Sequence, residues 1–235
     1  PWFSVSCCPT NIARTLASLP AYVATTSGDE LAIHQFVTGA VQANLAGTEV
    51  ALEFITDYPA DGDITARVAT GAGAWTLGLR VPSWCEGAAV TVNGQVAEAA
   101  VEGGKLLLSR TWAAGDVVTL SLPMPARFTW PDPRIDAVRG QVAVERGPLV
   151  HCLESADLGA DVEEAVLDVA AGLQVVDGNV LAAIGRRSVE EAPWAYSPTP
   201  MAGTHTGEAR RVRLQPYREW GNRGPGTMRV FLPTA

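Results

Sequence analysis

Apolar side chains recur at every second position over most of this sequence, and this alternation limits the fold more than any other feature. It is clearest at residues 75–81, where one face carries Trp, Leu, Leu and Val and the other carries Thr, Gly and Arg. A period of two is typical of half-buried antiparallel strands. Further strands are predicted at 50–54, 105–109, 117–122, 141–145 and 228–232. The chain is therefore expected to be mainly β.

Two short segments carry the signature of a tight β-hairpin. Residues 90–96 contain the pair Asn93-Gly94, and residues 176–180 contain Asp177-Gly178. Such pairs accept the positive φ angles of a type I′ turn, which joins neighbouring antiparallel strands. Many short strands separated by turn signals predict antiparallel β-sandwiches.

One segment near the start has a helical period instead. Pro9 suits a first helical position, because its missing N–H costs nothing there. Apolar side chains then follow at helical spacing: Ile12, Leu16, Leu19 and Val23. Gly28 is expected to close this helix, although Pro20 lies inside the pattern and allows a kink or an earlier end.

Proline marks the boundary between two strand-rich regions. Pro123-Met124-Pro125, followed by prolines at 131 and 133, interrupts the strand pattern where proline cannot donate to a ladder. A length of 235 residues suits two domains of ordinary size. We predict a terminal segment with its helix at 1–28, a first β-sandwich at 29–126 and a second at 127–235.

Charge and hydropathy exclude two classes of partner. The 17 Lys and Arg residues against 25 Asp and Glu give a net charge of −8, and the basic residues are scattered. No basic surface for a phosphate backbone is expected, so nucleic acid is excluded as a partner. No uninterrupted apolar stretch is long enough to span a bilayer, so a membrane is excluded as well.

Two adjacent cysteines, Cys7 and Cys8, stand immediately before the predicted helix. The unpaired N–H groups of a helix N-terminus favour a thiolate, which binds metals and attacks carbon. Two thiols cannot complete a tetrahedral zinc shell, and Cys85 and Cys152 show no ligand spacing. The residues by themselves leave a buried or oxidised pair as the alternative.

Six segments in order, beginning with this pair, resemble the glycoside hydrolase 127 family of β-L-arabinofuranosidases. The resemblance runs essentially from end to end of the chain. The segments are SCCPTN at 6–11, TDYPADG at 56–62, LRVPSWC at 79–85, VNG at 92–94, RGPLVHC at 146–152 and PYREWGNRG at 216–224.

The resemblance implies an active site in an N-terminal (α/α)6 barrel that is followed by β-sandwiches. Residues 1–28 would then hold the last helix of a truncated barrel. The resemblance implies that Cys7 is the nucleophile and that Cys7 and Cys8 bind zinc, together with a Glu and a third Cys. Those two ligands and the acid/base Glu would lie in the missing barrel.

The expected partners follow from the same resemblance: an arabinofuranoside substrate and the missing catalytic barrel. The exposed apolar face of the helix makes a homodimer a further candidate. The isolated chain is expected neither to hydrolyse glycosides nor to hold zinc tightly, because its ligand shell is incomplete. A zinc-bound thiolate favours the cytoplasm over secretion.

A non-catalytic carbohydrate-binding or scaffolding module is the alternative. It would need an exposed aromatic platform, for which Trp130, Trp194 and Tyr196 are the candidates. His151 and Cys152 are adjacent, but neighbours in a strand point to opposite faces, so no catalytic dyad is expected there.

Overall fold

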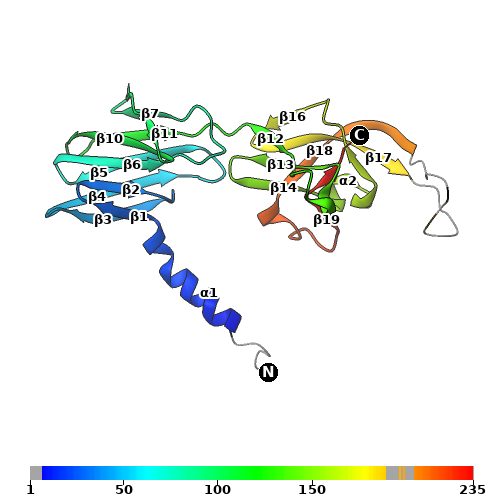
Figure 1. Ribbon diagram of the computed structural model, residues 1–235, viewed down its shortest axis with the longest axis horizontal. Coiled ribbons are helices and arrows are strands. Elements are labelled where there is room, and N and C mark those ends of the chain that lie inside the picture. Colours follow the sequence, from blue (N-terminus) through cyan, green and yellow to red (C-terminus); the bar gives the residue numbers. More distant parts are fainter. Residues whose placement is uncertain (1–6, 189–195, 197, 199–203, 235) are drawn as a thin grey trace. The chain divides into compact units, whose positions relative to one another are not determined.

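A helix opens the described chain, and β-strands form most of the rest (Figure 1). The computed structural model describes residues 7–188, 196, 198 and 204–234. Two units are distinguished, unit 1 at Pro1–Pro123 and unit 2 at Met124–Ala235. The predicted boundary after residue 126 stands close to this division, and Ala126 begins the first strand of unit 2.

Unit 1 is a sandwich of two sheets. Its helical elements are α1 (Cys7–Ser18) and the 3-10 turn η1 (Leu19–Tyr22). Sheet A has the order β1-β2-β6-β10-β9, and sheet B has the order β3-β4-β5-β11-β7-β8. The strands are β1 (Ala24–Ser27), β2 (Glu30–Ile33), β3 (Gly39–Leu45), β4 (Thr48–Thr56), β5 (Asp63–Thr70), β6 (Gly73–Arg80), β7 (Ala89–Val92), β8 (Gln95–Val96), β9 (Val101–Glu102), β10 (Lys105–Trp112) and β11 (Val117–Ser121).

The core of unit 1 lies between the two sheets. Trp75, Leu77 and Leu79 of β6 are all buried in it, which confirms the period of two in this segment. Leu52 and Phe54 of β4 enter the same core from the other sheet. Most strand pairs are antiparallel as predicted, but β2 and β6 are parallel. The chain leaves β2, builds three strands of sheet B and returns in the same direction, as a parallel pair requires.

The helix ends earlier than the position of Gly28 predicts. Pro20 cannot donate to a helical ladder, so the α-helix stops at Ser18 and a 3-10 turn follows. Residues 24–27 pair with β2 as a strand. Gly28, with φ +60°, reverses the chain in this hairpin instead of closing a helix.

Unit 2 is a nine-stranded antiparallel arrangement around its own core. Strands run in the order β12-β13-β14-β18-β17-β15, and β16, β19 and β20 pair with β17, β14 and β13, respectively. The bounds are β12 (Ala126–Thr129), η2 (Asp136–Val138), β13 (Gln141–Arg146), β14 (Leu149–Glu154), α2 (Ser155–Leu158), η3 (Val162–Glu164), β15 (Ala165–Leu167), β16 (Leu173–Val176), β17 (Asn179–Ser188), β18 (Thr204–Pro216), η4 (Tyr217–Glu219), β19 (Met228–Arg229) and β20 (Leu232–Pro233).

Both predicted hairpins are present. Asn93 and Gly94 have φ angles of 52° and 76°, and Asp177 and Gly178 have 49° and 76°. The single strand predicted at 228–232 is wrong, because two short strands pair there with different partners, β14 and β13. None of the described helices has the length and apolar character needed to cross a membrane.

Candidate functional site

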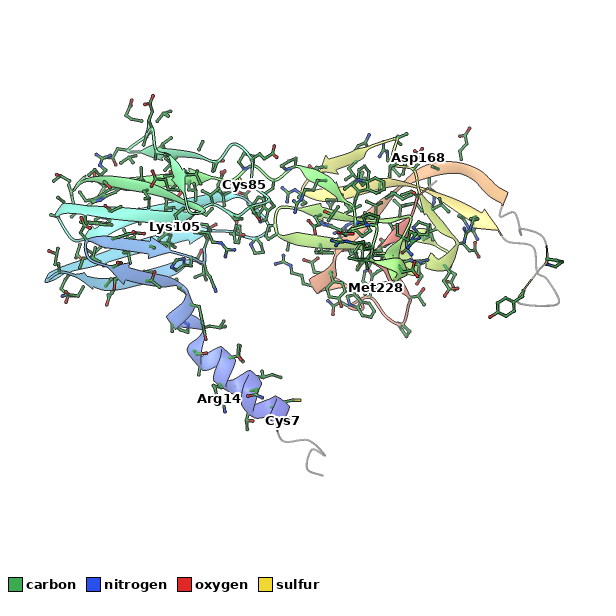
Figure 2. All side chains as sticks on the ribbon, viewed as in Figure 1. Cys7, Arg14, Cys85, Lys105, Asp168 and Met228 are labelled. Carbon is green, nitrogen blue, oxygen red and sulfur yellow. The ribbon has the colours of Figure 1, made fainter. Side chains whose placement is uncertain are left out.

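Cys7 and Cys8 are the first two residues of α1, and both are exposed free thiols. Figure 2 labels Cys7 at the N-terminal end of this helix. The two Sγ atoms lie 3.8 Å apart. A buried or disulfide-bonded pair, the alternative raised above, is therefore absent from the structure.

The distance between the two sulfur atoms suits a shared metal ion. At a Zn–S distance of about 2.3 Å, two thiolate ligands of a tetrahedral zinc are separated by about 3.8 Å. The described residues contain no group of three or more His, Cys, Asp or Glu side chains that could hold a metal. The pair therefore fits half of a zinc shell, and a complete shell needs two more ligands.

Hydrogen bonds between residues one turn apart line the polar face of α1. The Thr10 hydroxyl donates to the carbonyl of Cys7 at 3.0 Å, and the Thr15 hydroxyl donates to the carbonyl of Asn11 at 2.8 Å. The Arg14 guanidinium donates to the Asn11 side chain at 3.0 Å. These contacts are local, so they order the helix without fixing it to a neighbour.

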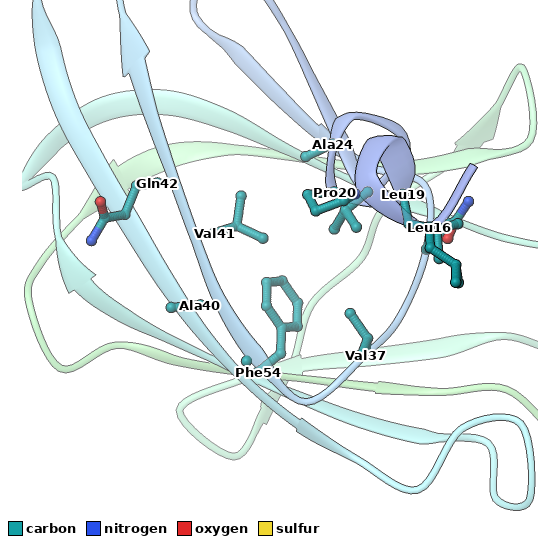
Figure 3. A pocket seen from close by; sticks show the side chains of 12 residues that line it. Leu16, Leu19, Pro20, Ala24, Val37, Ala40, Val41, Gln42 and Phe54 are labelled. Carbon is teal, nitrogen blue, oxygen red and sulfur yellow. The ribbon is translucent and has the colours of Figure 1, made fainter. Parts of the chain in front are cut away.

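The other face of α1 is apolar and uncovered. Ile12 and Leu16 are 61% and 62% exposed, and no residue of α1 is buried. A groove of about 650 Å³ lies beside this face (Figure 3). Leu16 and Leu19 line one side of the groove, and Val41 and Phe54 of sheet B line the other. Leu16 thus belongs both to the exposed face of α1 and to the lining of the groove.

Burial raises the pKa of both remaining thiols, Cys85 and Cys152, which disfavours the reactive thiolate form. Burial raises the pKa of Cys152 to about 11, and the Glu154 and Asp157 carboxylates add to the effect. Burial lowers the pKa of His151, whose Nδ1 lies 3.2 Å from the carbonyl oxygen of Leu149. A catalytic dyad needs a depressed thiol pKa beside a protonated imidazole. The raised pKa of the Cys152 thiol and the lowered pKa of the His151 imidazole both disfavour a thiolate–imidazolium pair.

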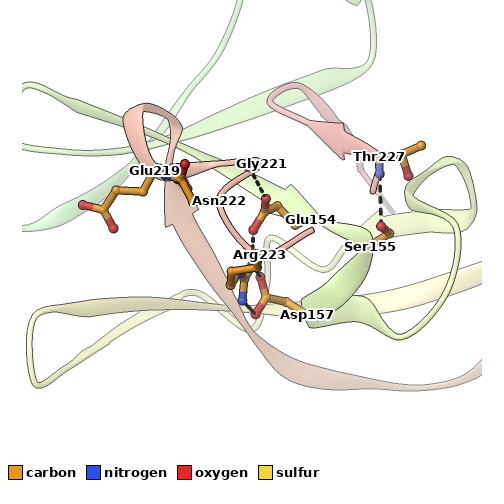
Figure 4. A network of polar contacts seen from close by, with 8 residues as sticks. All are labelled: Glu154, Ser155, Asp157, Glu219, Gly221, Asn222, Arg223 and Thr227. Atoms are coloured by element: carbon orange, nitrogen blue, oxygen red, sulfur yellow. Dashed lines mark hydrogen bonds and ion pairs between the residues drawn. The ribbon is translucent and has the colours of Figure 1, made fainter. Parts of the chain in front are cut away.

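An ion-pair network, which the sequence did not indicate, anchors the loop after β18 in unit 2 (Figure 4). Arg223 pairs with Glu154, and its Nη1 donates to Asp157 at 2.9 Å. The Gly221 N–H donates to Glu154 at 2.8 Å. Burial raises the pKa of the Glu154 carboxyl, but the Gly221 N–H and Arg223 outweigh burial and hold the pKa below its usual value. The partners are far apart in sequence, so no local pattern signals the network.

The aromatic candidates are exposed where they are described. Trp130 is 58% exposed and Tyr196 is 93% exposed. Trp194 lies outside the described residues. Tyr217 and Trp220, which sequence analysis did not single out, are 48% and 40% exposed beside the anchored loop. The described residues thus offer separate aromatic side chains in unit 2, and the thiol pair belongs to unit 1.

Two family models together match most of the chain from residue 30 onward. Residues 30–124 match the model described as beta-L-arabinofuranosidase, GH127 middle domain. Residues 126–233 match the model of the glycoside hydrolase family 127 C-terminal domain.

Individual relatives agree with the family models. A non-reducing end beta-L-arabinofuranosidase from Bifidobacterium longum subsp. longum is 34% identical over 98% of this chain and 37% of its own length. The crystal structure of a GH127 beta-L-arabinofuranosidase from Geobacillus stearothermophilus T6 has 34% identity and a TM-score of 0.84, over 100% of this chain and 38% of that one. A second solved structure, of a GH127 beta-arabinofuranosidase, has 29% identity and a TM-score of 0.85, and the match covers 100% of this chain and 39% of that chain. The chain spans about two fifths of these relatives.

Proposed function

Because this chain belongs to glycoside hydrolase family 127, we propose that it is the middle and C-terminal part of a retaining β-L-arabinofuranosidase whose nucleophile is Cys7. The observation that carries the proposal is the exposed thiol pair at the start of α1, in a chain that matches arabinofuranosidases along its length. The substrate would be a terminal β-L-arabinofuranosyl group. A reactive thiol pair also favours a reducing compartment, so we propose a cytoplasmic location.

Cys7 and Cys8 would hold zinc through their two sulfur atoms, and the other ligands would come from parts of the enzyme that this chain does not span. Bound zinc would keep the Cys7 sulfur deprotonated at neutral pH. The 3.8 Å separation of the sulfur atoms supports this assignment, because it requires little rearrangement of either side chain.

The reaction would have two steps. In the first, the Cys7 sulfur forms a bond to the anomeric carbon while the glycosidic C–O bond breaks, and a carboxylic acid from outside this chain protonates the departing oxygen. In the second, the same carboxylate removes a proton from water, which attacks the anomeric carbon and releases Cys7. Two inversions give net retention.

Helix α1 would position the nucleophile by packing against the rest of the enzyme. Its exposed apolar face and the adjoining groove are what a helix shows when its covering partner lies elsewhere. We propose that the upstream barrel of the longer enzyme covers this surface. A second copy of the chain is the competing occupant, and the oligomeric state of the longer enzyme distinguishes the two.

A chimera tests the proposal directly. This chain replaces the aligned segment of the Bifidobacterium longum enzyme, which supplies the remaining two thirds of the length. We expect turnover of 4-nitrophenyl β-L-arabinofuranoside. Cys7→Ser should lower kcat by about a thousandfold or more, since it removes the attacking group. Cys85→Ser, at a half-buried thiol remote in sequence, should leave kcat nearly unchanged.

Two results would contradict the proposal. Undiminished turnover by a folded Cys7→Ser chimera would exclude Cys7 as nucleophile. An inactive chimera that melts as cooperatively as the parent enzyme and binds one zinc would exclude the assigned activity. Circular dichroism and metal analysis of each variant separate these results from simple misfolding.

The exposed aromatic side chains favour one alternative, a carbohydrate-binding module. In that case the isolated chain would bind arabinan oligosaccharides, and Cys7→Ser would not alter the affinity. Trp130→Ala and Trp220→Ala would weaken binding, because stacking on an aromatic face supplies much of the affinity for a sugar. Isothermal titration of the three variants decides between the two functions.

A further inference from the structure

Three basic side chains lie in a row across neighbouring strands at one end of sheet A. Arg80 of β6 and Lys105 of β10 are direct partners in the antiparallel register. His34 follows β2, whose last residue pairs with Leu79 in the parallel register, so His34 stands beside Arg80. The three residues line a pocket of about 430 Å³. Figure 2 labels Lys105 in this sheet.

The described carboxylates near this row stand beside Lys105 and not beside Arg80. Like charges directly opposite one another destabilise a sheet. The positive charge of Lys105 is neutralised by an ion pair with Glu30, and Glu102 is the register partner of Lys105 on β9. Arg80 forms no ion pair with any described carboxylate, and its Nη1 donates to the carbonyl of His34 at 3.4 Å. One guanidinium thus faces the pocket with most of its donors available.

Two glycines of a neighbouring turn also line the pocket. Gly103 and Gly104 form the turn between β9 and β10, with φ angles of +56° and +74°. A Cβ atom at Gly103 would meet nothing within 4 Å, so the turn borders free space. Both residues line the pocket together with Ser83. The hydroxyl-bearing Ser83 and the two glycines therefore line the same hollow as Arg80 and Lys105.

We propose that this hollow, the Arg80 pocket, binds a small oxyanion, either the carboxylate of an acidic sugar or a phosphate group. Arg80 presents a planar fork of donors that matches two oxygen atoms of either group. A chain with net charge −8 repels anions in general, so binding here depends on the local positive charge of Arg80. None of the pocket residues belongs to α1, and the inference does not depend on the proposed hydrolase activity.

The test is a titration of the whole chain, followed by ¹H–¹⁵N NMR at constant ionic strength. One arm uses sodium galacturonate, a second uses inorganic phosphate, and the control uses neutral galactose. We expect the amide signals of Gly103 and Gly104 to shift in a saturable way with at least one anion and not with galactose. A response to galacturonate only assigns an acidic sugar, and a response to phosphate only assigns a phosphate.

Two variants with opposite effects sharpen the test. Arg80→Gln should weaken binding by about tenfold or more, because it removes charge-assisted hydrogen bonds. Glu30→Gln should strengthen it by about threefold, since Lys105 loses its neutralising partner. Arg110→Gln, an exposed arginine on the same strand as Lys105, is the matched control and should leave the affinity unchanged.

The inference is overturned if neither anion shifts the two glycine amides, or if galactose shifts them equally. It is also overturned if Arg80→Gln and Arg110→Gln weaken binding to the same extent, which would indicate general screening of surface charge. Should Arg80→Gln fail to fold, Glu30→Gln still decides, because unchanged or weaker binding by this variant contradicts the proposed electrostatics.

Discussion

Asn93 stabilises a hairpin of unit 1 through its backbone and its side chain together. Its φ of 52° suits asparagine better than most residues. Its Oδ1 accepts the Val117 N–H at 2.9 Å, and its Nδ2 donates to Asp116 at 2.8 Å. The side chain therefore joins the β7–β8 turn to the start of β11.

Replacing Asn93 separates these two contributions. Asn93→Gly keeps the backbone conformation and loses the hydrogen bonds, which should cost about 1 kcal/mol. Asn93→Ala loses both and should cost about 2 kcal/mol. Urea unfolding monitored by tryptophan fluorescence measures the difference. Equal losses for the two variants would show that the positive φ carries no cost here.

Gly62 presents a steric limit that its own sequence neighbours do not reveal. A Cβ atom at this position would lie 2.0 Å from the carbonyl oxygen of Leu122, which is backbone and cannot rotate away. We expect Gly62→Ala to destabilise unit 1 by about 3 kcal/mol. Gly185→Ala, whose Cβ would lie 3.8 Å from its nearest neighbour, is the control and should cost far less. Thermal unfolding of both variants tests the contrast.

These two residues also mark what sequence can reveal at this scale. The Asn93-Gly94 turn follows from a local pair with a known backbone preference. The requirement for glycine at 62 arises from a strand end that lies sixty residues later, so it exists only once the sheet has formed. For the same reason the charge balance at Arg80 could not be derived from its neighbours in sequence.

The loop after β18 depends on the ionised form of Glu154. The pKa of this carboxyl is lower in the folded protein than in the unfolded chain, so its stabilising effect is complete above an unfolded pKa of about 4.3. The effect is lost as the pH falls through the folded pKa. Glu154→Gln should therefore cost about 2 kcal/mol at pH 7, with a smaller penalty below pH 4.

Chemical unfolding of unit 2 at several pH values tests this expectation. Glu219→Gln is the control, because its exposed pair with the adjacent Arg218 contributes little. A penalty for Glu154→Gln that stays constant between pH 3 and pH 7 would show that the charge of Glu154 does not stabilise the loop.

Strands were predicted better than the helix was, and the reason is physical. Burial of one sheet face imposes a period of two, which the sequence of β6 displays directly. Between Leu19 and Val23 the apolar spacing still suits a helix, yet the α-helix ends before Pro20. Residues 24–27 pair with β2 and form strand β1. Pairing with a partner strand decides such ambiguous segments, and spacing within the segment does not contain that information.

Each unit has its own apolar core, which permits a prediction about the whole chain. The core of unit 1 and the core of unit 2 share no residue. We expect residues 1–123 and 124–235, produced separately, to unfold cooperatively, with midpoints close to the two transitions of the intact chain. Calorimetry measures them. A fragment without a cooperative transition would show that its core needs the other unit.

The isolated chain should hold zinc weakly. Two sulfur ligands supply half of a tetrahedral shell, so we expect a zinc affinity at least a thousandfold below that of the proposed chimera, and no glycoside turnover. Competition with a chromogenic chelator measures the affinity. Tight stoichiometric binding would contradict the assignment of the missing ligands to the rest of the enzyme. The sequence resemblance predicts the ligand role of the pair, and our proposal assigns the remaining ligands to parts of the enzyme that this chain does not span.

Almost every residue between the thiol pair and the first strand of the sandwich belongs to a helical element. The helix ends at Ser18, a 3-10 turn ends at Tyr22, and the first strand begins at Ala24. Inserting one residue into α1 would rotate the residues before the insertion, including Cys7 and Cys8, by about 100° around the helix axis. The length of α1 therefore sets the direction in which the two sulfur atoms point relative to the sheet. We expect insertions or deletions between residues 9 and 18 to impair function far more than insertions or deletions in the turns of either unit.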